Sequence, residues 1–271
     1  MFPILFQKGP WIIYTFSTMF LLASLTATFY AYFLASRKNL SPLVVLDLGF
    51  IGTLSAILGG RLFHAAVEAP QYYAQFPMEI LKIWKGGIVS YGAVLGITLS
   101  FYLYLKIRKL EMWKYADLMA LVGPIIIFFV RIGCLSQGCC YGKPTHFLIH
   151  LTFTNRLSDA AHYHDGVPLH ATQIYDLFFN GIFLFFILHW IDKRKKFDGQ
   201  VIAWFFILYG FMRGMVEFLR GDIDRGVYGG GVISTAQIMG IFSIGFGVYL
   251  YYYCRALARK KGMHASLPHP N

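Results

Sequence analysis

Charged residues are scarce in this chain, and acidic residues are the scarcest of them. Only 14% of the 271 residues are charged, and 13 acidic residues stand against 24 lysines and arginines, which gives a formal net charge of +11. A soluble globular domain carries about a quarter charged residues, so that class is excluded. The 57% hydrophobic and 18% aromatic content instead indicates a membrane protein with several spans.

The basic excess does not indicate nucleic-acid binding, because the sequence contains no compact basic segment. Its lysines and arginines cluster beside apolar stretches, which is typical of topology signals and of contact with anionic lipid. Cysteine is also rare, with four residues. Cys134, Cys139 and Cys140 fit neither a zinc spacing nor a disulfide framework. We interpret them as small packing residues and expect no metal or other cofactor.

Seven apolar stretches are long enough to cross about 30 Å of hydrocarbon as helices. The first has no small-residue cleavage site, so we expect it to remain as a span rather than to be removed as a signal peptide. No internal repeat is visible, and the sequence predicts one integral-membrane domain over 1–271. Its fold class is all-α, with spans at 11–36, 42–66, 87–106, 115–133, 173–191, 200–219 and 232–254.

Basic residues are distributed unevenly between the two ends of these spans. The connections after spans one, three, five and seven hold 14 of the 24 basic residues, whereas the opposite connections mix basic with acidic residues. Because basic loops stay in the cytoplasm, we expect the N-terminus outside and the C-terminus in the cytoplasm. The longest outward connection, 134–172, contains two prolines and five histidines. It predicts a small extracytoplasmic lobe with some strand.

Four charged residues lie inside the predicted spans or at their outer ends. A charge at membrane depth costs at least about 2.5 kcal/mol, so such a residue normally faces a wet or protein-lined cavity and marks a functional site. All four lie toward the outer ends of spans two, four and six, so we expect them to share one cavity. They are Arg61, Arg131, Arg213 and Glu217.

Span six carries the densest polar pattern, in the segment FILYGFMRGMVEFLRGDIDRG. Tyr209, Arg213, Glu217 and Arg220 recur at spacings that align them on one helix face. An Arg213–Glu217 pair could be purely structural, but a buried ion pair is a poor source of stability. Arg220 adds a further cation, so we interpret the stripe as an anion site. Lipid phosphate is the anion found at this depth, and guanidinium binds it in bidentate geometry.

Three further segments face the same side. VRIGCLSQGCCYGKPT (130–145) has glycines that allow a sharp turn after the arginine. KGGIVSYGAVLG (85–96) combines glycines suited to close helix packing with two hydroxyl groups. PLHATQIYD (168–176) opens span five with polar residues, of which a threonine can cap the helix. Their candidate cavity residues are Gly133, Gln137, Gly142, Ser90, Tyr91, His170, Gln173 and Tyr175.

Taken together, these motifs make the chain similar to the prolipoprotein diacylglyceryl transferase family. VRIGCLSQGCCYGKPT resembles the family signature G-R-[IL]-G-N-F-x-N-G-E-x-x-G-[RK]-P, and HATQIYD resembles H-P-S-Q-L-Y-E. YGFMRGMVEFLR is similar to Y-G-x-x-R-x-x-V-E-F-x-R, and ILKIWKGGIVSYGAVLG to a region with W-x-G-G-x-S-x-H-G-G. The matches keep the family's order over positions 59–240.

The resemblance implies a multi-pass enzyme of the bacterial inner membrane. Such an enzyme transfers the diacylglyceryl group of phosphatidylglycerol to the lipobox cysteine thiol of a preprolipoprotein signal peptide and releases glycerol 1-phosphate. It implies that Arg131 binds the lipid headgroup and that Arg213 and Glu217 form an essential pair. Further residues that match motif positions are Gly142, His170, Gln173, Tyr175, Tyr209 and Arg220.

Two departures from the family pattern leave alternatives open. Tyr91 stands where the family motif has a histidine that is often proposed as the base, and a phenol with a reference pKa near ~10 is a weaker base at neutral pH. Cys134, Gln137 and Cys139 replace two asparagines and a glutamate of the signature. A related transferase with another acceptor, or a non-catalytic phospholipid-binding or transport protein, are the alternative functions.

Overall fold

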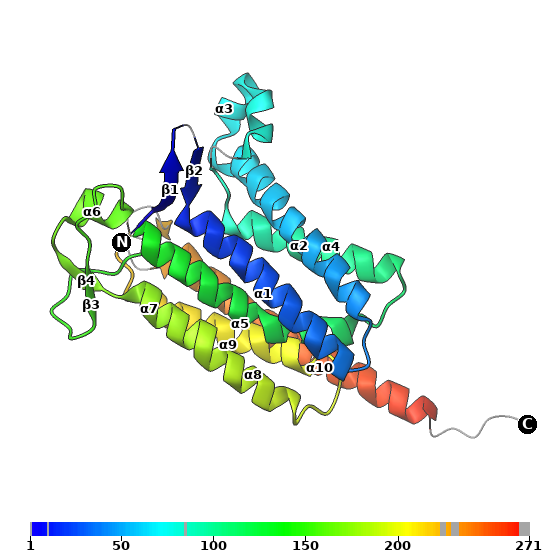
Figure 1. Ribbon diagram of the computed structural model, residues 1–271. Coiled ribbons are helices and arrows are strands. Elements are labelled where there is room, and N and C mark those ends of the chain that lie inside the picture. The colour runs from blue at the N-terminus through cyan, green and yellow to red at the C-terminus, as the bar shows by residue number, and fades with distance from the viewer. Residues whose placement is uncertain (1, 10, 84–85, 223–225, 229–232, 266–271) are drawn as a thin grey trace, which may run out of the picture. The chain divides into compact units, whose positions relative to one another are not determined.

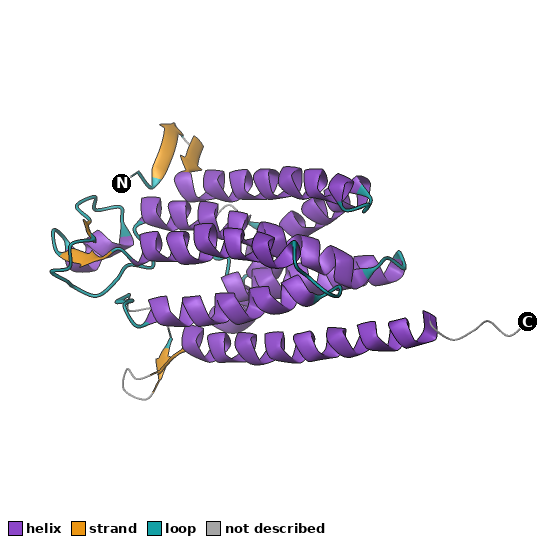
Figure 2. Ribbon diagram, turned by 90° about the horizontal axis from the view of Figure 1, so that it is seen from below, coloured by secondary structure: helices purple, strands orange, loops and turns teal. Residues whose placement is uncertain are grey.

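The computed structural model describes residues 2–9, 11–83, 86–222, 226–228 and 233–265 of a mostly helical chain (Figures 1 and 2). The chain forms two compact units. The first contains Met1–Ala27 and Ala116–Asn271, and the second contains Thr28–Tyr115. The helix α1 (Thr15–Arg37) contributes to both units.

The second unit is built around a close pair of helices, α2 (Pro42–Phe63) and α4 (Ser90–Ile107) (Figure 1). Between them the chain forms a π-helix (His64–Glu68), α3 (Pro70–Gln75) and a 3₁₀ helix (Pro77–Leu81). A Cβ added to Gly92 would collide with the carbonyl oxygen of Gly59. This contact allows the two backbones to touch and confirms the predicted packing role for Gly92 and Gly96, whereas Gly86 and Gly87 precede α4 in a left-handed backbone conformation.

Arg61 lies at the end of α2 and is 3% exposed. Its guanidinium donates to the carbonyl oxygens of Ile80 at 3.0 Å and Lys82 at 3.1 Å, and also to those of Glu79 and Gly86. These bonds satisfy backbone acceptors in a segment that has little regular structure of its own. Arg61 thus holds the connection before α4 in the second unit, and the cavity role expected from the sequence remains a prediction.

The first unit contains the remaining long helices. They are α5 (Met112–Gln137), which enters this unit at Ala116, then α7 (Thr172–Asp176), a π-helix (Leu177–Phe183), α8 (Leu184–Asp192), α9 (Gln200–Glu217) and α10 (Thr235–Ala265). α9 packs against α10, where a Cβ added to Gly210 would lie 2.7 Å from the carbonyl oxygen of Gly240. α8 also contacts α9. Closely spaced helices thus form the body of this unit.

A small lobe follows α5 in the chain, as predicted for 134–172. Strand β3 (His150–Thr152) pairs antiparallel with β4 (Pro168–His170), and α6 (Asp159–His164) lies between them in sequence. Its core is formed by Tyr141, Phe153, Ala160, Ala161 and Leu169. The expected combination of strand and irregular chain is confirmed.

Several predicted helix boundaries are wrong. Residues 11–14, predicted as the start of the first span, form strand β2 (Trp11–Tyr14), which pairs with β1 (Ile4–Lys8). Aromatic and β-branched residues favour this strand, and helix α1 begins only at Thr15. A third antiparallel pair, β5 (Val227–Tyr228) with β6 (Ile233–Ser234), precedes α10. The predicted start of span seven at 232 lies outside the described residues.

Five of the described helices are long and apolar enough to cross a membrane. This supports an all-α membrane protein, as expected from composition. The five segments are Thr15–Arg37, Pro42–Glu68, Ser90–Ile107, Met112–Gln137 and Thr172–Asp192.

The buried carboxylate of Asp117 joins α5 to the start of α9. Its Oδ1 accepts the backbone N–H groups of Val201 at 2.9 Å and Ile202 at 3.0 Å, and its Oδ2 accepts that of Gly199 at 3.0 Å. The Nζ of Lys195 lies 3.0 Å from the same Oδ2. Asp117 therefore acts as an N-cap supplied by another helix, for a helix whose own N-cap residue is a glycine.

Burial alone would lower the pKa of Lys195, but the carboxylates of Asp117 and Asp198 outweigh this effect and raise it. A raised pKa keeps Lys195 protonated at neutral pH. The stability that it contributes is fully present below the pKa of an ordinary lysine and is lost only as the pH rises through the higher folded-state value.

We predict that Asp117→Asn destabilises the chain by about 1–3 kcal/mol, because the amide keeps one acceptor oxygen and replaces the other with an NH₂ donor, which leaves part of the buried N–H groups at the start of α9 without an acceptor. The expected result is a lower melting temperature of the detergent-purified protein, followed by tryptophan fluorescence. Asp198→Asn is the matched control, because Asp198 contacts the same lysine at 3.3 Å from a half-buried position, with 43% of its side chain exposed. Equal melting temperatures for the two variants would contradict the capping role.

Candidate active site

The loop that follows α5 begins with a tight helix end. The N–H groups of Gly138 and Cys139 both donate to the carbonyl oxygen of Cys134, at 2.9 and 3.2 Å. Gly138 has a φ of +74°, which a glycine adopts without strain, and Cys140 has a φ of +59°. The chain therefore reverses sharply at the position that the glycine pattern predicted.

Side chains from the start of α7 hold this loop. The Nε2 of Gln173 donates to the carbonyl oxygen of Cys139 at 2.8 Å, and the Oγ1 of Thr172 donates to that of Cys140 at 2.7 Å. Gln173 and Thr172 are both buried. Gln173, predicted as a cavity residue, thus donates its amide N–H to the loop backbone, while its Oε1 has no hydrogen-bond partner among the described residues.

Gly142 lies where the loop passes between β4 and the end of α9. It forms an isolated antiparallel bridge with Arg220, and the neighbouring N–H of Lys143 donates to the carbonyl oxygen of Leu219 at 2.9 Å. A Cβ added to Gly142 would collide with the backbone and Cβ of His170. The signature glycine is therefore required for close contact between three chain segments.

Two arginines from different helices meet at one buried carboxylate. Arg131 of α5 places its Nη2 2.7 Å from the Oδ2 of Asp176, at the end of α7. Arg213 of α9 places its Nε 3.8 Å from the same oxygen. Only 4% of the Asp176 side chain is exposed, and its Oδ1 also accepts a hydrogen bond from Asn180. Asp176 thus links α5 to α9.

The polar stripe predicted on span six continues this network. The Nη1 of Arg213 lies 2.7 Å from the Oε2 of Glu217, and the Nη1 of Arg220 lies 3.5 Å from the same atom. The Nε of Arg220 also donates to Asp222 at 2.8 Å. The predicted alignment of Arg213, Glu217 and Arg220 on one helix face is therefore observed as a connected chain of ion pairs.

The charge balance of this network differs from the sequence-based inference. The helical periodicity of span six alone predicts more guanidinium groups than carboxylates. In the structure, two carboxylates from outside that helix, Asp176 and Asp222, also pair with the arginines. The described network therefore pairs three arginines with three acids and is formally neutral. Its members are Arg131, Arg213, Arg220, Asp176, Glu217 and Asp222.

Arg131 still has donors that no carboxylate uses. Its Nε is buried without a hydrogen-bond partner, and its Nη1 has only the Sγ of Cys134 at 3.9 Å, a weak acceptor. The side chain is 14% exposed. Within the described part of the chain, Arg131 is thus an arginine fixed at one nitrogen and able to donate at the others.

The thiol of Cys140 lies in the field of this network. Hydrogen bonds with the thiols of Cys134 and Cys139 lower the pKa of Cys140, burial opposes them, and the guanidiniums of Arg131 and Arg220 lower it further. The net effect holds this pKa well below that of an ordinary thiol. For Arg220, burial would lower the pKa, but Cys140 and the nearby carboxylates raise it. Arg220 is therefore cationic at any working pH.

Other predicted residues have mainly structural contacts. A Cβ on Gly133 would lie 2.9 Å from the ring of Phe16, so this glycine brings α5 close to α1. The Tyr175 hydroxyl donates to the carbonyl oxygen of Ile149 at 2.6 Å and ties α7 to the lobe. Tyr209 stacks on Phe205, with ring centroids 5.7 Å apart.

The remaining candidates fall into two groups. In the first unit, His170 is half-buried at the end of β4, and its Nδ1 has no hydrogen-bond partner in the part of the chain that the structure describes; Gln137 is half-buried as the last residue of α5. Ser90 and Tyr91 form the first turn of α4 in the second unit, which also contains Arg61. The structure thus brings together Arg131, Arg213, Glu217 and Arg220, with Gly142 beside Arg220.

Asp176 is the residue that sequence reasoning missed. In the sequence it is only one of several polar residues at the start of span five. The available signal was an acid entering an apolar helix in a chain with unpaired membrane arginines, because such a charge requires a partner.

Comparison with known proteins agrees with this architecture. The family model described as prolipoprotein diacylglyceryl transferase matches residues 3–253. A phosphatidylglycerol–prolipoprotein diacylglyceryl transferase of Clostridium tetani is 34% identical over 249 residues, which cover 92% of this chain and 96% of the relative. A protein with the same name from Pasteurella multocida is 30% identical over 262 residues, covering 96% and 94%. The chain therefore belongs to the prolipoprotein diacylglyceryl transferase family.

Proposed function

We propose that this chain transfers the diacylglyceryl group of phosphatidylglycerol to the cysteine thiol of a prolipoprotein signal peptide. The observation that carries the proposal is the buried network in which Asp176 fixes Arg131 and Arg213. A preorganised guanidinium pair suits a reaction whose leaving group is a phosphate monoester. Family membership over nearly the whole chain supports the same reaction.

We further propose seven spans in a bacterial inner membrane, with the N-terminus outside. Two helices join the five that meet the apolar criterion. α9 has 18 residues and α10 has 31, and both are long enough to cross the hydrocarbon. The lower hydropathy of α9 follows from Arg213 and Glu217, which face protein rather than lipid. The basic connections support the orientation.

In the proposed mechanism, Arg131 receives the phosphate of the donor lipid. Asp176 orients its guanidinium through Nη2, while Nη1 and Nε remain to donate. Arg213, oriented by Glu217 and Asp176, stabilises the charge that develops as the C–O bond to the phosphate breaks. The acceptor thiolate forms the new C–S bond, and glycerol 1-phosphate leaves.

The thiol must lose its proton before it attacks, because the thiolate is the nucleophile. Two side chains are candidates for the base. His170 has a buried, unpartnered Nδ1 in the same unit as Arg131. Tyr91 stands in the family's histidine position, in the second unit. The unpartnered nitrogen favours His170.

We predict that Arg131→Ala lowers formation of thioether-linked diacylglyceryl peptide at least about 100-fold, because a donor aimed at developing charge is removed. Purified protein, phosphatidylglycerol and a lipobox peptide would be combined and the peptide product measured by mass spectrometry. Arg194→Ala is the control, since Arg194 is exposed and stacks on Trp190. Release of glycerol phosphate without modified peptide would indicate another acceptor. Binding of phosphatidylglycerol without turnover would indicate a non-catalytic phospholipid-binding protein.

Asp176→Asn is predicted to lower kcat more than tenfold without raising the KM for phosphatidylglycerol. The amide no longer orients two guanidiniums, yet loss of one negative charge makes the network more attractive to phosphate. Steady-state kinetics across lipid concentrations measure both constants. A raised KM with unchanged kcat would assign Asp176 to donor binding instead.

The base is identified by comparing His170→Gln with Tyr91→Phe. We predict that His170→Gln lowers kcat at least about 100-fold, the lower end of the range for general-base catalysis, whereas Tyr91→Phe has a small effect. Binding of phosphatidylglycerol by each variant serves as the control for folding. The reverse order of effects would assign the proton transfer to Tyr91.

A further inference from the structure

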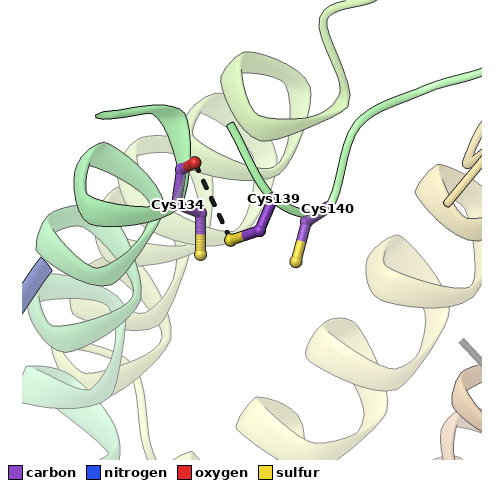
Figure 3. Close-up of side chains that lie close together, drawn as sticks. All are labelled: Cys134, Cys139 and Cys140. Atoms are coloured by element: carbon purple, nitrogen blue, oxygen red, sulfur yellow. Dashed lines mark hydrogen bonds between the residues drawn. The ribbon is translucent and has the colours of Figure 1, made fainter. Parts of the chain in front are cut away.

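Three of the four cysteines gather at the end of α5. Cys134 lies in the last turns of the helix, and Cys139 and Cys140 lie on the loop that folds back over it (Figure 3). Their Sγ atoms all lie within 4.8 Å of one another. All three are free thiols, and the Sγ of Cys139 points toward the backbone oxygen of Cys134.

The backbone holds this arrangement in place. The left-handed residues Gly138 and Cys140 produce the reversal, and α7 pins the carbonyl oxygens of Cys139 and Cys140 through Thr172 and Gln173. Three ligand atoms that are already held by a helix end and a fixed loop lose little conformational entropy when they bind an ion. The spacing in the sequence does not reveal this cluster, because the turn at Gly138 is what brings Cys139 and Cys140 close to Cys134.

We propose that Cys134, Cys139 and Cys140 form a binding site for one soft metal ion of low coordination number, Cu⁺. Metal–sulfur bonds of about 2.3 Å place the sulfurs of a three-thiolate site about 4 Å apart. Because the Sγ atoms already lie within 4.8 Å of one another, each sulfur–sulfur distance would shorten by less than about 1 Å on metal binding. The ion binds all three sulfurs as thiolates, and each sulfur that is still protonated releases its proton to solvent.

The donor set favours Cu⁺ over other ions. Thiolates select Cu⁺, Zn²⁺ and iron–sulfur clusters, whereas carboxylates and carbonyls suit Mg²⁺ and Ca²⁺. Among the described residues, the group holds three sulfurs and no histidine or carboxylate. Zn²⁺ takes four ligands in structural sites, so a site with three sulfurs fits it less well.

Nearby cations compensate the charge of such a site. One Cu⁺ and three thiolates carry a formal charge of −2, and the Nη1 of Arg131 lies 3.9 Å from the Sγ of Cys134. The guanidinium of Arg220 also stabilises negative charge at Cys140. Opposite charge reduces the cost of burying the thiolate centre.

The same proximity couples the metal site to the reaction, a consequence that rests on the proposed function. With Cu⁺ bound, Arg131 would face a centre of higher negative charge than the metal-free cluster, so a donor phosphate would meet a stronger competitor for its guanidinium. We expect the apparent KM for phosphatidylglycerol to rise at least about tenfold when Cu⁺ is bound.

The test is an anaerobic titration of the full chain in detergent with the Cu⁺–bathocuproine disulfonate complex. Loss of the chelate absorbance reports transfer to the protein. The variants are Cys134→Ser and Cys139→Ser, with Cys254→Ser as the matched control, because Cys254 is buried in α10 outside the cluster. Alkylation followed by peptide mass spectrometry identifies protected thiols in the unmodified chain, so the answer does not depend on folding of a variant.

We expect one Cu⁺ per chain in the parent and in Cys254→Ser, at least about tenfold weaker binding in the other variants, and protection of the three clustered thiols. Equal binding by all variants, protection of Cys254 alone, or a disulfide within the cluster of anaerobically purified protein would overturn the site. Tighter binding of Zn²⁺ than of Cu⁺ would overturn the assignment of the ion. Metal binding with an unchanged KM would remove only the coupling to the reaction.

Discussion

Burial of arginine between helices is the constraint on which the rest of this structure depends. An isolated guanidinium inside a helical bundle is costly, and removing a partner from a buried pair leaves an uncompensated charge. Here the carboxylate of Asp176 is shared by Arg131 and Arg213, which come from α5 and α9. The short helix α7 must therefore lie between them. Its position also determines that of the loop after α5, because Gln173 of α7 donates a hydrogen bond to the loop backbone.

Neutrality also changes how the site can work. A cluster with excess positive charge would bind any anion, whereas a balanced one offers only directed donors, such as the Nη1 of Arg131, whose contact is the weakly accepting Sγ of Cys134. Recognition then depends on geometry more than on net attraction. This suits an enzyme in a membrane rich in anionic headgroups, because selectivity requires discrimination among lipids that all carry phosphate.

Much of the fold was accessible from sequence because long apolar runs have few alternatives in a membrane. Local chemistry still overrode hydropathy at Trp11–Tyr14, where aromatic and β-branched residues form a strand before α1. Within the site, helical periodicity placed Arg213, Glu217 and Arg220 together, since all three belong to one helix or its end. It had no access to Asp176, whose partners lie on other helices, nor to the cysteine cluster, which depends on the turn at Gly138.

Asp117 caps the start of α9, although it precedes Gly199, the N-cap residue of that helix, by 82 positions in the chain. The first N–H groups of a helix have no partner within it and are usually capped by a neighbouring residue or by water, but here three of these amides depend on a segment synthesised well before them. The start of α9 is therefore fully satisfied only after it docks on α5. Completion of the N-terminus of α9, the helix that carries Arg213, therefore depends on the earlier insertion of α5, which supplies the acceptor.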